Sequence, residues 1–298
     1  MLSPKYIFKS FMLMAVFCAG PFLLHAEESI LTIGSIGGSP SEEVIKFQPL
    51  ADYLGQHLKA VGIESCQVVA TTTMVKMAKL LKKGKVDIYF DSPFPAIQVA
   101  NKSGSEIFLR RWKKGVKEYR SLIFTHKDSG IENLGDLVDE VIAFEEPFST
   151  SAYFLPKATI LKQGLQMSEL KSPEDNIPDG KIGYVFSEDD EATVLWVARG
   201  IVAAGAVNNI DFEELAGSDL VDLTIIKETI DVPRQVVSHR ADLDPKIINA
   251  LKDILVNMDK TEDGQAVLAA FKKTKRFDDF DGDIDAQMNP IINLVKEL

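Results

Sequence analysis

The sequence predicts an α/β protein of two lobes, each a mixed, mostly parallel sheet with flanking helices, joined by two hinge strands. Three observations support this fold class. The 298 residues exceed what one small core needs and fit two lobes of ordinary size. Strand and helix patterns alternate over residues 29–90, which is typical of a parallel sheet with right-handed crossovers. Two long apolar strands, Tyr119–His126 and Leu223–Thr229, bracket a further α/β unit.

The first lobe begins with three strands separated by two helices. A loop of small residues at 35–40 follows the first strand, and Ser41 with two acids after it is typical of a helix start. Gly84 ends the second helix. The expected strands are SILTIG at 29–34, QVVA at 67–70 and VDIYF at 86–90, and the second helix covers Met74–Lys83.

The second lobe is expected as an insertion into the first. A strand at 140–144, a helix over 150–164, a helix over 191–199 and a small-residue strand at 203–207 form its α/β unit. Because the two long strands are interpreted as crossings, they form a hinge, and a cleft is expected between the lobes at the carboxyl ends of their strands. The predicted division is 27–122 plus 228–298 for lobe one and 123–227 for lobe two.

The N-terminus has the features of a secretory signal peptide covering residues 1–26, so the mature protein is expected in the periplasm. Two lysines precede an apolar run, Phe11–Leu24, and cleavage is expected after Ala26. The run is too short to span a bilayer comfortably. Lipidation at Cys18 is not expected, because Phe17 stands where lipoprotein processing requires a small residue.

The acidic balance of the chain excludes some classes of partner. The formal net charge is −11, and it becomes −13 without residues 1–26, which hold two lysines and no acid. This charge argues against binding to nucleic acid or to anionic lipid, so any anion must be held by local groups. Only Cys66 remains in the mature chain, and the isolated histidines suggest no metal site; we expect no cofactor.

Three consecutive hydroxyl residues at one helix start are the strongest candidate for an anion site. Ser149, Thr150 and Ser151 follow a strand and a turn, and a helix start offers unpaired N–H groups at the positive end of its dipole. The alternative is an ordinary helix cap, which needs one hydroxyl, and both interpretations stay open. Thr71–Thr73 repeats the arrangement in lobe one, and the loop at Gly38 adds backbone donors.

Four segments resemble the PhnD-type family, the phosphonate- and phosphite-binding proteins of ABC importers. They are VDIYFDSPFPA (86–96), EYRSLIF (118–124), FEEPFSTSAYFLP (144–156) and VPRQVVSHRADLDP (232–245). The resemblance covers most of the mature chain and implies the type II periplasmic-binding-protein fold and a monomer. It also implies that the phosphorus oxyanion is bound by Ser149, Thr150, Ser151 and Ala152, with Thr72, Thr73, Asp91 and Ser92 at lobe-one cleft positions.

Two departures from the family pattern leave the other end of the ligand open. Members often carry Gly-Ser/Gly-His-Glu/Asp before the helix that begins near Glu191; here Asp190 stands where His is expected. Members also often read Val-Asp-Ala-Gly-Ala-Val, and here Ala203 replaces the acid. In amino-phosphonate binders such acids hold the ligand's ammonium group. Asp190 and Glu191 either do so here or are ordinary first-turn acids.

We therefore expect an extracytoplasmic solute-binding protein that captures phosphonate, phosphite or phosphate in the cleft and delivers it to the membrane permease of an ABC importer. A sensing protein of the same fold that signals to a membrane receptor is the alternative. An enzyme is not expected, because only Asp190 and Glu191 offer an acid–base pair. The basic run Arg110–Lys114 is expected to be a solvated loop face.

Overall fold

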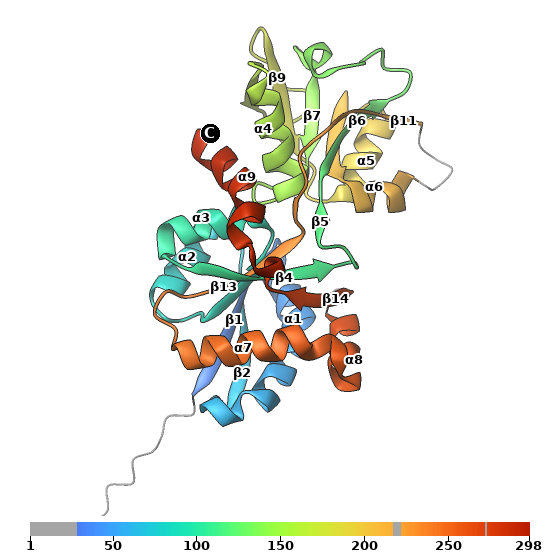
Figure 1. Cartoon of the computed structure of the whole chain (residues 1–298). Helices are drawn as coiled ribbons and strands as arrows, with labels where there is room; N and C mark the ends of the chain where they lie inside the picture. Colours follow the sequence, from blue (N-terminus) through green and yellow to red (C-terminus); the bar gives the residue numbers. More distant parts are fainter. Residues whose placement is uncertain (1–28, 217–221, 272) are drawn as a thin grey trace, which may run out of the picture.

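The protein is a two-lobed α/β molecule, shown in Figure 1 as a computed structural model. The structure describes residues 29–216, 222–271 and 273–298. The predicted signal peptide, with Cys18 and the cleavage at Ala26, lies outside the described residues. Each lobe is built on its own sheet, and helices cover both faces of each sheet.

The first sheet, which defines lobe one, has the order β14-β4-β13-β3-β1-β2. Its strands β1 to β4 run in one direction, while β13 and β14 run against them. The bounds are β1 Ile30–Ile36, β2 Ser65–Thr71, β3 Ile88–Asp91, β4 Glu106–Lys113, β13 Gln235–His239 and β14 Thr274–Asp278. Most of the strands therefore end at one edge, as in a parallel sheet.

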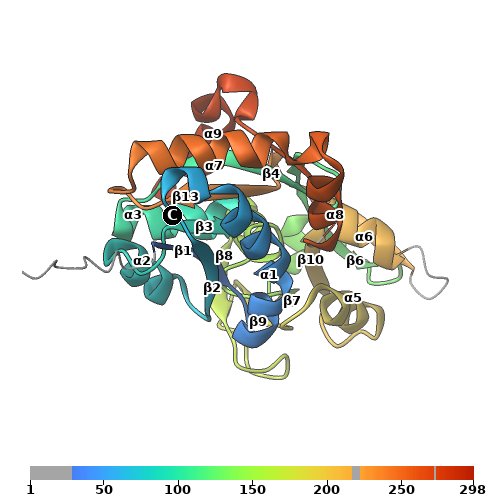
Figure 2. The same cartoon turned by 90° about the horizontal axis from the view of Figure 1, so that it is seen from below.

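Alternation along the strands of lobe one creates two apolar faces. Ile88 and Phe90 of β3 point into one core, and Tyr89 between them points into the other. Figure 2 shows α1 and α7 near each other and α2 and α3 together on another side of the lobe. One core packs α1 Pro40–His57, α7 Pro245–Asn257 and α8 Glu262–Ala270; the other packs α2 Met74–Lys82, α3 Pro93–Ser103 and α9 Ile284–Glu297.

The second sheet, which defines lobe two, has the order β11-β6-β10-β7-β9-β8, and of its strands β6 runs against the rest. The strands are β6 Ser121–His126, β7 Val141–Phe144, β8 Gln166–Glu169, β9 Lys181–Phe186, β10 Ala204–Asn208 and β11 Leu223–Glu228. The helices are α4 Leu155–Lys162 on one face, and α5 Asp190–Ala198 and α6 Asn209–Ala216 on the other. Short turns are η1 Lys59–Val61, η2 Leu134–Leu137, η4 Met258–Lys260 and η5 Phe280–Gly282.

A two-stranded ribbon, β5 Glu118–Tyr119 with β12 Val232–Pro233, connects the lobes (Figure 1). The long strand expected over Tyr119–His126 is divided at Arg120, because the backbone N–H of Arg120 donates to the side chain of Asn209. The strand that follows, β6, lies wholly in the sheet of lobe two. The lobe boundaries at 122/123 and 227/228 stay a prediction, and the crossings themselves are shorter than expected.

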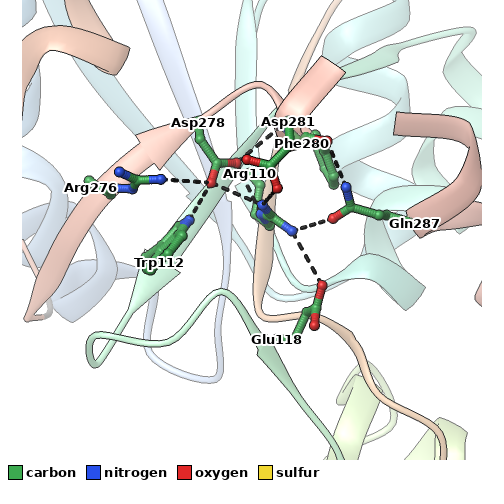
Figure 3. Close-up of polar contacts among 8 residues, drawn as sticks. All are labelled: Arg110, Trp112, Glu118, Arg276, Asp278, Phe280, Asp281 and Gln287. Atoms are coloured by element: carbon green, nitrogen blue, oxygen red, sulfur yellow. Dashed lines mark hydrogen bonds and ion pairs between the residues drawn. The ribbon is translucent and has the colours of Figure 1, made fainter. Parts of the chain in front are cut away.

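The basic run Arg110–Lys114 is not a solvated loop, and that expectation was wrong. Arg110 and Arg111 lie on β4 with fully buried side chains. Figure 3 shows Arg110 bound by two parallel hydrogen bonds of 3.0 Å to Asp278, with Gln287 and Glu118 on its other side. The charge is buried because a carboxylate from β14 compensates it, a pairing that the local sequence does not show.

Candidate ligand-binding cleft

A cavity of about 450 Å³ lies between the lobes, at the carboxyl ends of their strands. Lobe one contributes the loop after β1 and the end of β3, and lobe two contributes the turn after β7 and the start of α5. The ribbon contributes Tyr119, and Arg234 directly follows β12 of the ribbon. In open α/β sheets, ligands bind in the crevice outside the carboxyl ends of the strands. The cavity between the lobes is therefore the candidate ligand-binding site.

The turn after β7 places two serine hydroxyls in the cavity. A π-helical turn, η3 Thr150–Phe154, begins here and continues into α4. Ser149 is its N-cap and accepts the N–H of Ala152 at 3.1 Å, so its hydroxyl serves as the cap while it also lines the cavity. Ser151 lines the cavity as well and is almost fully buried. Hydroxyls and free N–H groups at this turn suit an anion.

Thr150, between the two serines, is not among the residues that line the cavity. Its side chain is 1% exposed and faces lobe one. The hydroxyl donates to Ser92 Oγ at 2.8 Å and accepts the N–H of Phe94 at 3.0 Å. Within this turn, neighbouring hydroxyls therefore do different work: the serines face the cavity and the threonine connects the lobes.

A buried guanidinium supplies the positive charge beside these hydroxyls. Arg234 lines the cavity, is 5% exposed and lies 4.4 Å above the ring of Tyr119. Its Nε has no hydrogen-bond partner among the described residues. Burial raises the pKa of Tyr119, while Arg234 and a hydrogen bond with Ser151 act in the opposite direction. A buried cation with an unsatisfied donor is costly without an anion to receive it.

Acidic groups nevertheless dominate the lining. Among the described residues, the cavity lining contains nine carboxyl side chains and three cationic side chains. Of these cations, Lys46 is paired with Glu42 at 3.2 Å. The lobes also approach closely, because a Cβ placed on Gly38 would lie 3.0 Å from Glu146 Oε1 across the cleft. Burial first, and then the charges of neighbouring carboxylates with Glu145 foremost, together raise the pKa of Glu146 to about 7.

Three of these acids, Glu145, Asp190 and Asp211, lie near enough to Arg234 for its charge to act on them. Burial first, and then the charges of Glu145 and Asp211, together raise the pKa of Asp190 to about 8. Asp190 Oδ1 is buried with no partner in the described part of the chain. Burial also favours the neutral form of Asp211, but hydrogen bonds from Lys114 and Asn208 outweigh it and lower its pKa. The cavity thus contains both groups that attract an anion and a cluster of carboxyls close to them.

These features coincide with a known family. Residues 37–284 match the family model described as the ABC transporter, phosphonate, periplasmic substrate-binding protein. The chain belongs to this family. The expected kinship with phosphonate-binding proteins is therefore confirmed, and the family consists of periplasmic substrate-binding proteins.

Individual relatives agree with this assignment. The phosphonates-binding periplasmic protein of Escherichia coli strain K12 is 24% identical over 196 residues, 63% of this chain, and the match spans 55% of that relative's length. The structure of XAC2383 from Xanthomonas citri bound to chloride has 25% identity and a TM-score of 0.85, covering 90% of this chain and 98% of that one. The same protein bound to ATP gives a TM-score of 0.83, with the same identity and coverage.

The methylphosphonate complex of PhnD1 from Prochlorococcus marinus has the same fold, with 19% identity, a TM-score of 0.67 and coverage of 91% of this chain and 98% of that one. The type II periplasmic-binding-protein fold is thereby confirmed. No helix among the described residues is long and apolar enough to cross a membrane.

The structure brings together about half of the residues expected at the phosphonate-binding site. The cavity lining contains Gly38, Asp91, Ser92, Ser149, Ser151 and Asp190, and it does not contain Thr72, Thr73, Thr150, Ala152 or Glu191. Thr73 instead caps α2 by accepting the N–H of Lys76 at 3.3 Å, and Thr72 and Glu191 are exposed. Lining by itself does not establish binding, so the predicted site residues stay a prediction.

Sequence analysis did not single out Arg234, Tyr119, Glu145 or Asp211. Tyr119 and Arg234 lie inside two of the family-like segments, EYRSLIF and VPRQVVSHRADLDP, which was the available signal. They are far apart along the chain and meet because β5 pairs with β12. Asp211 lies in the first turn of α6, which directly follows β10, and no motif marked this position.

Proposed function

We propose that this protein captures a small phosphorus oxyanion (phosphonate, phosphite or phosphate) in the cleft and delivers it to the permease of an ABC importer. The observation that carries the proposal is the buried Arg234, whose Nε lacks a partner among the described residues, next to Ser151 and Tyr119. A guanidinium offers several donors in one plane and suits an oxyanion with oxygens on one face. The family assignment supports the transport role.

The closed form of the two lobes is the form expected to hold the ligand. The donors come from lobe two at Ser149 and Ser151 and from the ribbon at Arg234, while Ser92 and the loop at Gly38 belong to lobe one. Only the closed form presents both sets to one ligand, so the ligand favours that form by its differential affinity. No bond is made or broken, so the proposal includes no catalytic step.

The carboxyls of the cavity indicate what other group the ligand carries. An anion without a positive charge would enter a space lined by nine carboxyls, and a like-charged ligand is repelled there. The charges of Glu145 and Asp211 both raise the pKa of Asp190, so the three carboxyls lie close together. We therefore expect a phosphonate whose other end is cationic, such as 2-aminoethylphosphonate, to bind more tightly than methylphosphonate.

A thermal-shift screen of residues 27–298 tests the function and the site together. The panel is phosphate, phosphite, methylphosphonate, 2-aminoethylphosphonate and sulfate. A ligand at 100 times its Kd adds about 2.7 kcal/mol of stability, which is an easily visible shift. Arg234→Gln removes the buried charge and should weaken the phosphorus ligand by about tenfold or more.

Arg199→Gln is the matched control, because Arg199 is exposed at the end of α5 and outside the cavity lining. It should leave the shift unchanged. The proposal would be contradicted by the absence of a shift with every phosphorus compound. A shift that survives in a correctly folded Arg234→Gln variant would remove Arg234 from the site while keeping the function.

A further inference from the structure

The two lobes also touch beside the ribbon, where Thr150, Phe94 and Phe154 lie near Tyr119. Thr150, in the turn of lobe two, bonds to Ser92 and Phe94 at the start of α3 in lobe one. Ser92 is the N-cap of α3, yet its hydroxyl makes no capping bond within its own helix. It receives the bond from Thr150 and lies 3.3 Å from Asp91 Oδ1. A residue of the other lobe thus satisfies an N–H at the start of α3.

Aromatic packing surrounds these hydrogen bonds. The rings of Phe94 and Phe154 are stacked with centroids 4.3 Å apart and planes inclined by 4°. Both side chains are more than nine-tenths buried. They belong to one apolar cluster that contains Ile97 of α3 and Ile291 of α9 from lobe one and Leu155 of α4 from lobe two. Opening the lobes at this place would expose that surface to water.

We propose that Thr150 and Phe154 are positioning residues of an interlobe latch, which holds the ligand-free protein closed and sets the rate at which ligand enters. The latch consists of Thr150 and Phe154 from lobe two with Ser92 and Phe94 from lobe one. Thr150 acts through α3 and does not contact the ligand. The scattering measurement below needs no ligand, and only the kinetic measurement rests on the proposed function.

The latch has a definite kinetic signature. Ligand enters only when the lobes are apart. The association rate constant is therefore proportional to the fraction of free protein that is open, and a latch that reduces this fraction lowers the rate constant. The same contacts keep the complex closed and lower the dissociation rate. Removing them raises both rate constants by a similar factor and leaves Kd nearly unchanged. Loss of a direct ligand contact would raise the dissociation rate alone and weaken Kd.

Small-angle scattering without ligand is the first measurement. The ligand-free wild type should have the radius of gyration expected for the closed structure. Thr150→Val, which keeps the side-chain shape, and Phe154→Leu should each give a larger radius when ligand-free. Thr125→Val is the control, since Thr125 is also fully buried but donates to Ala203 within lobe two.

Stopped-flow fluorescence with 2-aminoethylphosphonate is the second measurement. In Thr150→Val the association and dissociation rate constants should both rise, by about tenfold for a lost buried hydrogen bond. Thr125→Val should leave them unchanged, and circular dichroism confirms that each variant is folded. A ligand-free wild type that is as open as the variants would overturn the latch. A rise in dissociation alone would make Thr150 a ligand contact.

If no member of the ligand panel binds, the proposed function fails, but the latch is still decided by the ligand-free radii. Those radii compare the wild type with Thr150→Val and Phe154→Leu under one condition. A larger radius in the two variants supports the latch, and equal radii contradict it.

Discussion

At the scale of single residues, the cleft shows how neighbouring side chains of one motif divide their work. Ser149, Thr150 and Ser151 share a chemistry, yet the two serines line the cavity and Thr150 bonds to lobe one. The backbone imposes this division, because consecutive residues of a helical turn point in different directions. The sequence motif therefore identifies the turn, and the three-dimensional structure determines which hydroxyl lines the cavity and which bonds to lobe one.

Asp190 leads to a prediction about pH and ligand charge. Its pKa is raised to about 8, chiefly by burial, so the carboxyl is mostly neutral at neutral pH and ionises as the pH rises through about 8. An ammonium group favours the ionised form. The preference for 2-aminoethylphosphonate over methylphosphonate should therefore grow between about pH 6 and about pH 8, as measured by the ratio of the two Kd values.

The matched variants are Asp190→Asn and Glu213→Gln. The first removes the titration and should weaken 2-aminoethylphosphonate by about tenfold or more, with less effect on methylphosphonate. The second removes an exposed acid of α6 that does not line the cavity and should change neither ligand. If Asp190→Asn leaves the ratio of the two Kd values and its pH dependence as in the wild type, Asp190 does not bind the ammonium group of the ligand.

At the scale of elements, buried charge connects strands that are distant in sequence. Arg110 of β4 binds Asp278 of β14, and Trp112 donates to the same carboxylate at 2.5 Å (Figure 3). Burial favours the neutral form of Asp278, but hydrogen bonds from Arg110 and Trp112 outweigh it and lower its pKa. The C-terminal strand is thereby fixed to the sheet that carries the cleft.

Arg110→Met should destabilise the protein by about 3–5 kcal/mol, because it leaves the carboxylate of Asp278 buried without its main partner. Urea unfolding followed by circular dichroism measures the effect. Arg276→Met is the comparison, since the side chain of Arg276 is 39% exposed and lies 3.7 Å from the same carboxylate. Its cost should be below about 1 kcal/mol. Equal costs for the two variants would contradict a special role for the buried pair.

At the scale of the whole molecule, one of the apolar clusters crosses the boundary between the lobes. It joins α2, α3 and α9 of lobe one with α4 of lobe two and includes Tyr119 and Val232 of the ribbon. The other clusters stay within a single lobe. A shared cluster couples the stability of the two lobes, so neither unfolds without exposing apolar surface of the other.

Calorimetry should therefore show a single transition for residues 27–298, with a calorimetric enthalpy equal to the van't Hoff enthalpy. Phe154→Leu weakens the shared cluster and should broaden the transition or divide it. Leu251→Ala, a substitution in the core of lobe one alone, should lower the midpoint without dividing it. Two separate transitions in the wild type would show that the ribbon and the shared cluster do not couple the lobes.

The sequence by itself determined the features that depend on neighbours along the chain. Helix starts such as Ser149 and Thr73, the alternation of strands and helices, and the two-lobed α/β class follow from local hydrogen bonding and periodicity. The family-like segments indicated the family to which the chain belongs. These features hold in the fold because their physical cause acts over a few residues.

Only the tertiary structure decided which side chains meet in the cleft and between the lobes. Arg234 reaches Tyr119 because β12 pairs with β5, and Arg110 is buried because β14 brings Asp278 beside it. Thr150 faces lobe one because the start of α3 lies there and the N–H of Phe94 donates to its hydroxyl. Each of these depends on contacts between segments 50 or more residues apart. The energy of burying a charge or a hydroxyl depends on a partner that the local sequence does not contain.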